Sequence, residues 1–379
     1  MNRSNSGANL PALRSHNTAL VLDLLRTAGE RGISRLGLAA RTGLTPQAVS
    51  KITARLRAEG LAAEAGRRAS TGGKPRTVLR LVPEAGHAVG LHLDRDGLTA
   101  VLADLAGTVV ASRTAPLDLG APPGEVVAAA AGAVDAVRGD GTRPVLGLGA
   151  AVPGPLDHRG GVLHRVTGFP QWDGYPLRDA LAARTALPVV IDKDTNAAAL
   201  GLALQLPEPA DFAYLHLGTG LGAGLVIGGE VHRGARTGAG EFGHQTVQLD
   251  GPVCGCGGRG CIEALCLAAV ARGDVTEAAR VLGTGAANLV GLLDIGRVVL
   301  GGRLVAADPE AYVRGVRAVL DERARRDGAL GVPVPVATTT GGDRPVAEGA
   351  AQLVLAPLFG RVAGDSGGTE RDSGRTEAE

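Results

Sequence analysis

Residues 240–263 read GEFGHQTVQLDGPVCGCGGRGCIE and place one histidine and three cysteines in a short, glycine-rich segment. These four residues are His244, Cys254, Cys256 and Cys261. One imidazole and three thiolates form a ligand set that tetrahedral Zn²⁺ accepts, and glycines let the loop fold around the ion. No ligand position is left open, so we predict a structural zinc. Disulfides or inert buried thiols are the alternatives. Cys266 lies outside this spacing and is expected in the core.

Two carboxylates flank the predicted ligands. Glu241 lies one turn before His244, and Glu263 follows the last cysteine by two residues. GEFGH followed by CGCGGRGCIE resembles the signature of the ROK family, which groups sugar-responsive repressors with sugar kinases. The resemblance implies that the histidine and cysteines hold a structural zinc, and that Glu241, His244 and Glu263 contact a sugar. It leaves open whether the chain represses transcription or phosphorylates sugars.

The length and composition indicate a protein of two or more domains. The chain has 379 residues, 45% of them hydrophobic and 2% aromatic, so its cores are built mostly from Ala, Leu and Val. The N-terminal MNRSNSGANL lacks the apolar stretch of a signal peptide, and no apolar run is long enough to span a bilayer. We therefore expect a soluble, cytoplasmic protein without a membrane partner.

Charge divides unevenly along the chain. Residues 1–82 contain fourteen Lys and Arg and four Asp and Glu, a net charge of +10, which leaves −9 for the rest of a chain whose total is +1. A basic segment joined to an acidic body indicates that the first part meets a polyanion. A merely solvated basic face is the alternative.

Three predicted helices favour DNA as this polyanion. They cover residues 16–27, the segment RLGLAARTG after a capping Ser34, and the segment PQAVSKITARLRAEG after a capping Thr45. Two short helices joined by a glycine-containing turn are typical of a helix-turn-helix, whose second helix enters the major groove. The exposed side of that helix is expected to contact DNA through Gln47, Ser50, Lys51, Thr53 and Arg55.

A hairpin with a basic tip is predicted next, in LAAEAGRRASTGGKPRTVLRLV. Apolar strand residues flank the tip on both sides, which favours the wing of a winged helix over a flexible linker. A flat basic arm of this kind can enter a minor groove. The DNA contacts expected from it are Arg67, Arg68, Lys74 and Arg76. ROK repressors begin with such a module, and the family's kinases generally lack it.

The remaining chain is predicted as one effector domain over residues 83–363, followed by a disordered tail at 364–379. Successive strands with turns at Asp96-Gly97 and Ala106-Gly107 precede alternating helices and strands. This α/β pattern fits the two-lobed, actin-like ATPase fold of sugar kinases that the ROK resemblance implies. A small ligand is expected in the cleft between the lobes.

The loops that would bind ATP depart from those of family kinases. The kinase turn that approaches the phosphates is glycine-rich, and here it reads HLDRD over residues 92–96, with two anionic side chains. The second loop, LGTGLG over residues 217–222, is intact, and it is equally a tight hairpin or a phosphate loop. VVLGG at 298–302 resembles the nucleotide-side loop, yet it can be a strand ending in a turn.

The catalytic motif is kept only in part. The family motif Asn-Asp-x-Asn reads Lys193-Asp194-Thr195-Asn196 here, so Asp194 matches the general base and Lys193 replaces a sugar-binding asparagine. A second family asparagine corresponds to Gly168. We interpret Asp194 as a vestigial base that contacts the effector together with Lys193. A salt bridge between Asp194 and Lys193 or another cation is the alternative. The cation that Lys193 adds, and the space that Gly168 opens beside it, favour either a sugar with an acidic substituent or a larger glycoside.

These features predict a DNA-binding transcriptional regulator of sugar metabolism, specifically a repressor. It is expected to act as a homodimer or homotetramer, with a degenerate sugar-kinase body that binds a sugar-like effector and is not an enzyme. An active ATP-dependent sugar kinase with an accessory DNA-binding domain is the main alternative. A zinc-stabilised binding module without a ligand is the other.

Overall fold

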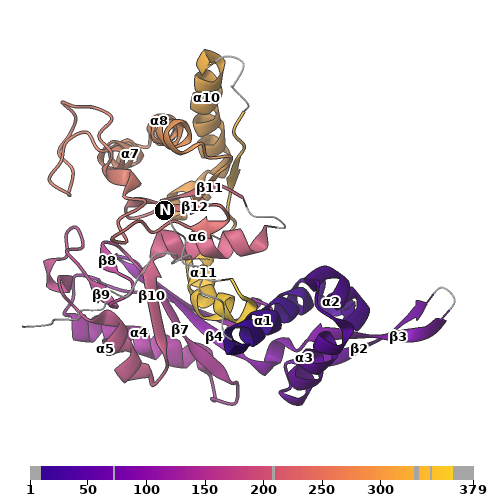
Figure 1. Ribbon diagram of the computed structural model, residues 1–379. Helices are drawn as coiled ribbons and strands as arrows, with labels where there is room; N and C mark the ends of the chain where they lie inside the picture. The colour runs from indigo at the N-terminus through magenta and orange to yellow at the C-terminus, as the bar shows by residue number, and fades with distance from the viewer. Residues whose placement is uncertain (1–9, 71–72, 207–209, 328–332, 342–343, 362–379) are drawn as a thin grey trace, which may run out of the picture.

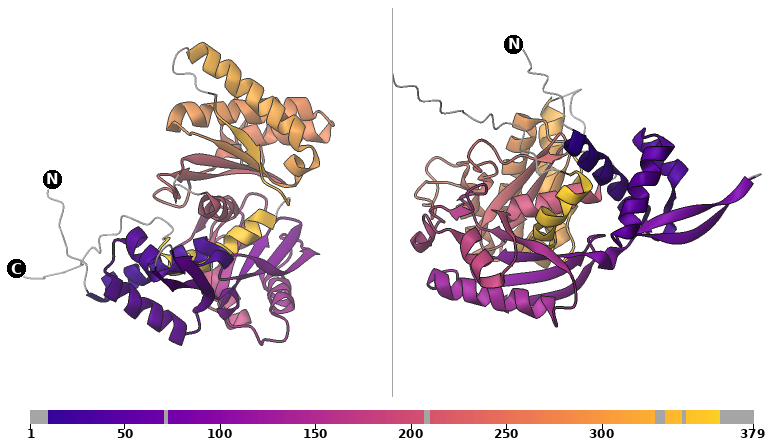
Figure 2. Two further views of the ribbon diagram at one scale, coloured as in Figure 1. Left: turned by 90° about the vertical axis from the view of Figure 1, so that its right-hand side faces the viewer. Right: turned by 60° about the horizontal axis from the view of Figure 1, so that its bottom comes forward.

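The computed structural model describes residues 10–70, 73–206, 210–327, 333–341 and 344–361 (Figure 1). The tail predicted at 364–379 lies outside the described residues. The chain has a mixed α/β fold in which a small N-terminal module adjoins a larger two-lobed body, as the two views of Figure 2 also show. None of the described helices is long and apolar enough to span a membrane.

The three N-terminal helices are present where they were predicted. They are α1 (Leu10–Ala28), α2 (Arg35–Thr42) and α3 (Pro46–Ala58), so α1 begins six residues earlier than expected. Both predicted caps form, because the Ser34 hydroxyl accepts from the Gly37 amide at 3.1 Å and the Thr45 hydroxyl accepts from the Ala48 amide at 3.2 Å.

The predicted hairpin is confirmed as well. Strands β2 (Ala62–Ser70) and β3 (Gly73–Leu81) pair antiparallel, and β1 (Ile33–Ser34) joins the other edge of β3. The ribbon of β2 and β3 projects away from the body (Figure 1).

The first lobe is built on a five-stranded mixed sheet of order β10-β7-β4-β5-β6. Its strands are β4 (His87–Leu93), β5 (Gly97–Asp104), β6 (Val109–Pro116), β7 (Val145–Val152) and β10 (Val189–Lys193). Helices α4 (Pro123–Arg138) and α5 (Leu177–Thr185) cover one face and enclose a core rich in Val, Leu and Ala.

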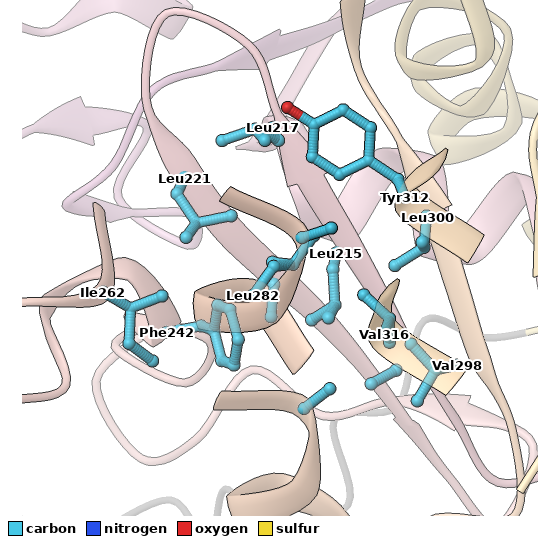
Figure 3. Close-up of a cluster of buried hydrophobic side chains, with 14 of the residues drawn as sticks. Leu215, Leu217, Leu221, Phe242, Ile262, Leu282, Val298, Leu300, Tyr312 and Val316 are labelled. Atoms are coloured by element: carbon cyan, nitrogen blue, oxygen red, sulfur yellow. The ribbon is translucent and has the colours of Figure 1, made fainter. Parts of the chain in front are cut away.

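The second lobe has its own five-stranded sheet, of order β13-β12-β11-β14-β15. Its strands are β11 (Phe212–Leu217), β12 (Leu221–Ile227), β13 (Glu230–Val231), β14 (Val298–Gly301) and β15 (Val336–Thr338). A core of aliphatic residues with Phe242 and Tyr312 fills the space beneath the helices (Figure 3). Those helices are α7 (Ile262–Ala271), α8 (Val275–Leu293) and α10 (Pro309–Asp327).

Two helices, α6 (Asp194–Gln205) and α11 (Arg344–Leu355), lie between the sheets (Figure 1). Their backbones touch neighbours directly at glycines. A Cβ on Gly90 of β4 would lie 1.9 Å from the Ala347 carbonyl oxygen of α11. A Cβ on Gly349 of α11 would lie 1.9 Å from the Ala197 carbonyl oxygen of α6. Shorter elements complete the chain: η1 (Gly29–Arg31), η2 (Pro83–Ala85), β8 (Leu156–Asp157), β9 (Val162–Leu163), η3 (Pro170–Trp172), η4 (Phe242–His244), α9 (Arg303–Ala307) and η6 (Ala356–Phe359).

The N-terminal module shares a hydrophobic core with the body. Val21 and Leu25 of α1 belong to the same buried cluster as Leu355 of α11 and Phe359 of η6. The Arg26 guanidinium lies 5.2 Å above the Phe359 ring, and an ion pair between Arg361 and Asp23 at 3.2 Å borders this contact. The module is thus packed onto α11 and η6 through side chains.

Candidate functional site

A cavity of about 270 Å³ opens between the two lobes. All the residues expected to contact an effector line it, although they come from four separate elements. β10 ends at Lys193, α6 begins at Asp194, Glu241 and His244 bound η4, and Glu263 lies in the first turn of α7. The fold therefore brings into one cavity residues that are up to 70 positions apart in the sequence.

Asp194 occupies the junction of β10 and α6. Its carboxylate accepts a hydrogen bond from the Thr195 amide at 2.6 Å. Burial raises the pKa of Asp194, and the neighbouring His216 and His92 oppose that shift without cancelling it. A carboxyl group held in this way can accept a hydrogen bond from a sugar hydroxyl, and more of it stays protonated than at an exposed aspartate.

Lys193 has a different environment from the one predicted. Its side chain is 4% exposed, and its Nζ donates to Glu241 Oε1 at 3.2 Å and to the Ala239 carbonyl oxygen. Lys193 lines the cavity as predicted, and Glu241 balances the charge that it would add there. The alternative of a salt bridge between Lys193 and Asp194 does not form, because Lys193 pairs with Glu241 instead.

Side chains of the turn between β4 and β5 in the first lobe bond to residues of the second lobe. Asp94 accepts a hydrogen bond from the Thr219 hydroxyl at 2.6 Å, and Asp96 forms a bidentate ion pair with Arg303 at 3.0 and 2.8 Å. Burial acts to raise the pKa of Asp94, but the Thr219 hydroxyl, the Arg95 amide and two nearby histidines together lower it. An anionic carboxylate thus lies at the predicted phosphate turn.

The LGTGLG loop is the tight turn between the antiparallel strands β11 and β12, as one of its two interpretations predicted. The Gly218 amide donates to the Gly220 carbonyl oxygen at 2.9 Å. Glu263 Oε2 accepts from the Leu221 amide at 2.8 Å. Glu263 therefore fixes this turn from α7 and faces the cavity at the same time.

The four predicted metal ligands form one cluster, with all ligand atoms within 4.8 Å of one another. His244 Nδ1 lies 3.7 Å from Cys254 Sγ, and the sulfurs of Cys256 and Cys261 are 3.8 Å apart. A tetrahedral ion with metal–sulfur bonds of about 2.3 Å requires sulfurs about 3.8 Å apart, so the donor set fits such an ion. The cysteines are not bridged by disulfides. Without a metal, burial raises the pKa of Cys261 to about 12. Cys266 is buried outside the cluster, as predicted.

The residues expected to contact DNA fall into four groups, of which the buried Thr53 is described separately below. Gln47, Ser50 and Lys51 are exposed on α3. Arg55 is half exposed, donates to the Thr18 hydroxyl at 2.6 Å and pairs with Glu59. Side chains of the four ribbon residues lie outside the described part of the structure, although their backbone belongs to β2 and β3.

Thr53 was assigned to the exposed side of α3, and this assignment is wrong. The residue is fully buried, and its hydroxyl donates to the Val49 carbonyl oxygen at 2.8 Å. Arg35 Nε of α2 donates to the same hydroxyl at 3.3 Å. Thr53 therefore joins α2 to α3 instead of facing outward. Helical spacing places it beside Val49 and Leu56, and that spacing was the available signal.

Two arginines that line the cavity, Arg95 and Arg165, were missed as candidate ligand contacts. Arg95 is the central residue of the β4–β5 turn and lies between Asp94 and Asp96, the two anionic residues that distinguish this turn from that of the kinases. Arg165 directly precedes residues 166–172, the stretch in which Gly168 aligns with a family sugar contact. Its position next to that stretch was the one signal that could have identified it.

Comparison with known proteins gives a consistent result. Residues 88–271 match the family model described as "ROK family". A xylose repressor of Caldicellulosiruptor bescii is 31% identical over 256 residues, which are 66% of this chain and 63% of the repressor. The structure of a ROK hexokinase from Thermus thermophilus is 30% identical with a TM-score of 0.57, covering 72% of this chain and 99% of the hexokinase.

A second similar structure shares most of the fold. It is a ROK family transcriptional regulator, described as a homologue of the E. coli MLC protein, with a TM-score of 0.73 at 21% identity. The superposition covers 92% of this chain and 98% of that regulator. The chain spans 59–63% of the length of the first curated repressors that it matches.

Proposed function

Because the chain belongs to the ROK family, we propose that it is a DNA-binding transcriptional regulator of sugar metabolism, specifically a repressor. Its two-lobed body binds a small, sugar-derived effector. The observation that carries the proposal is the packing of a basic three-helix module with a projecting ribbon onto that body. Xylose repressors among the relatives support the same conclusion.

The proposal assigns DNA binding to the N-terminal module, and its three helices and projecting hairpin support this assignment. We assign residues 1–82 to a winged helix-turn-helix domain and residues 83–363 to the effector domain. The exposed face of α3 enters the major groove, where Gln47 can pair with adenine and Lys51 with guanine or phosphate. Arg55 and the basic ribbon residues Arg67, Arg68, Lys74 and Arg76 add phosphate or minor-groove contacts. A homodimer or homotetramer presents two such modules to a pseudo-palindromic operator.

The effector occupies the cavity between the lobes. Asp194, Glu263 and His244 face it with hydrogen-bonding groups suited to sugar hydroxyls. Because Asp194 opens α6 and α6 packs on α11 at Gly349, ligand binding at Asp194 can bias the position of α11. α11 and η6 support α1, so the module responds to the same movement.

We assign a structural Zn²⁺ to His244, Cys254, Cys256 and Cys261. When bound, the ion holds the zinc loop, residues 240–263, against α7. With Nδ1 directed to the metal, His244 keeps Nε2 for the effector. Elemental analysis should find one zinc per chain, and Cys256→Ser should remove most of it. Cys266→Ser, outside the cluster, should retain it; equal zinc in both variants would contradict this ligand set.

The body does not act as a kinase in this proposal. Phosphoryl transfer depends on positioning and on stabilising negative charge. Here Asp94 and Asp96 place two carboxylates at the phosphate turn, and both are bonded to the opposite lobe. The second candidate, a sugar kinase with an accessory DNA-binding domain, is favoured by the hexokinase among the similar structures and by the retained Asp194.

The proposal is tested by DNA binding. Fragments selected from genomic DNA should show a protected pseudo-palindrome, with half-sites about one or two helical turns apart. Lys51→Ala should weaken binding about tenfold or more, whereas Arg314→Ala on α10 should not. Equal binding by both variants would refute the assignment of α3. A coupled assay with ATP and neutral sugars, if it showed turnover at ordinary kinase rates, would establish the second candidate instead.

A further inference from the structure

Two guanidinium groups in the effector cavity lack an acidic partner within the described part of the chain. They belong to Arg95 and Arg165, which line the cavity from the β4–β5 turn and from the segment after β9. No carboxylate of the described residues forms an ion pair with either one. Burying a guanidinium against a ligand is favourable when the ligand supplies the missing anion.

The acidic residues of the same cavity, in contrast, are bonded within the protein. Asp94 accepts from the Thr219 hydroxyl, Glu241 pairs with Lys193, and Glu263 accepts from the Leu221 amide. Burial raises the pKa of Asp194, so this carboxyl resists ionisation. Each of these carboxyl groups thus has a partner within the protein or resists ionisation, whereas neither guanidinium has a carboxylate partner among the described residues.

Arg95 is also held in a defined place. The aspartates on either side of it are bonded to the opposite lobe, Asp94 to Thr219 and Asp96 to Arg303. Its guanidinium carbon lies 5.8 Å from the Phe169 ring centroid. A Cβ built on Gly220 would lie 3.6 Å from its Nη2 and 3.0 Å from Glu263 Oε2, so the guanidinium lies close to the turn between β11 and β12. The residues on both sides of Arg95 are therefore tied to the opposite lobe, which limits where its guanidinium can lie and reduces the entropy lost on binding.

The size of the cavity limits the ligand. A volume of 270 Å³ lies below the range of about 300–1,000 Å³ that is typical of pockets for drug-sized ligands. This favours a monosaccharide with one substituent over a larger glycoside.

We propose that Arg95 and Arg165 form an anion subsite, so that the effector is a monosaccharide carrying a carboxylate or a phosphate group. The inference rests on the proposed sensor function and specifies its ligand class. Guanidinium groups bind both anions through paired hydrogen bonds, so the two sources are separated by experiment.

Calorimetric titration of the full chain tests the subsite. The probes are three matched sets: glucose with glucuronate and glucose 6-phosphate, galactose with galacturonate and galactose 6-phosphate, and xylose with xylonate and xylose 5-phosphate. We expect at least one anionic sugar to bind about tenfold or more tightly than its neutral parent. Comparing the carboxylate and the phosphate member of each set then identifies which anionic group the subsite binds. Added KCl should weaken the binding of that sugar.

Variants assign the effect to the two arginines. Arg95→Gln and Arg165→Gln should each lower affinity for the anionic sugar by about 10- to 100-fold. Arg95→Lys keeps the positive charge but not the planar pair of N–H donors, so it should lose less affinity than Arg95→Gln. The control is Arg113→Gln on the exposed face of β6, which should bind like the wild type. Circular dichroism of each variant confirms folding.

Three results would overturn the subsite. They are equal affinity for neutral and anionic sugars, full anion affinity in both glutamine variants, or no binding of any anionic sugar. Protection of operator DNA by the wild type is measured in parallel. If protection persists while the anionic sugars fail, the regulator proposal stands and only this inference falls.

Discussion

At the scale of single residues, neighbouring positions in the cavity have opposite electrostatic environments. Lys193 ends β10 with its side chain neutralised by Glu241, whereas Asp194 begins α6 in surroundings that disfavour its charge. The sequence identified both as cavity residues from a motif. It could not show which carboxylate would pair with Lys193, because Glu241 lies 48 positions away and reaches it only through the fold.

The environment of Asp194 predicts a pH effect on stability. Because burial raises its pKa in the folded state, the folded protein holds more protons than the unfolded chain between the ordinary value of 3.8 and the raised value. The contribution of Asp194 to stability is therefore greatest below pH 3.8 and declines as pH rises through that window. Asp194→Asn removes the decline and should be more stable than the wild type at neutral pH.

Urea unfolding over a pH series measures this effect. The advantage of Asp194→Asn should shrink as pH falls toward the ordinary aspartate value, because the wild-type carboxyl is then protonated as well. Asp173→Asn, at an exposed position after η3, is the matched control and should show no such trend. A constant difference at every pH would contradict the assigned cause.

At the scale of elements, the sequence predicted the features that depend on residues close together in the chain, such as helix caps and turns. Ser34 and Thr45 cap α2 and α3 as expected, and the turn between β4 and β5 falls at Asp96-Gly97. Thr53 was misplaced although its helical spacing puts it beside Val49 and Leu56; its hydrogen bond with Arg35 of another helix was the part that the sequence could not show. The position of α11 between the sheets was not predictable either, since it depends on glycines distant in sequence, Gly90 and Gly349.

Those glycines provide a test at the same scale. Gly349→Ala would place a methyl group 1.9 Å from the Ala197 carbonyl oxygen, so the helices must separate. We expect a loss of about 2–3 kcal/mol in the free energy of unfolding, the upper part of the range for overpacking. Gly132→Ala on α4 meets no atom within 4 Å and should gain about 0.5–1 kcal/mol from helix propensity. Urea denaturation that ranked the two variants the other way would contradict the proposed packing.

At the scale of the whole molecule, the N-terminal module and the two-lobed body share one core. Phe359 of η6 is 5% exposed and packs on α1 beneath Arg26, whereas its neighbour Leu358 is 41% exposed. Phe359→Ala should loosen α1, because truncating a buried Phe typically costs about 3–5 kcal/mol. Leu358→Ala is the matched control and should have little effect.

Hydrogen exchange and DNA binding measure the consequence. In Phe359→Ala, amides of α1 should exchange faster and DNA affinity should fall, although Phe359 belongs to the body and is distant in sequence from α3. Leu358→Ala should match the wild type in both. Unchanged exchange in α1 of Phe359→Ala would show that the module stands without the body.

The shared core also bears on how such regulators can be rebuilt. A designer who grafts residues 1–82 onto another sensor would transplant Val21 and Leu25 without the surface that covers them. The hybrid would expose apolar side chains and risk aggregation. A working chimaera must therefore import α11 and η6, or a receiving helix with the same complementarity. The segments that must be transferred together are therefore the N-terminal module and its support, α11 and η6. Transfer of the N-terminal module alone would omit that support.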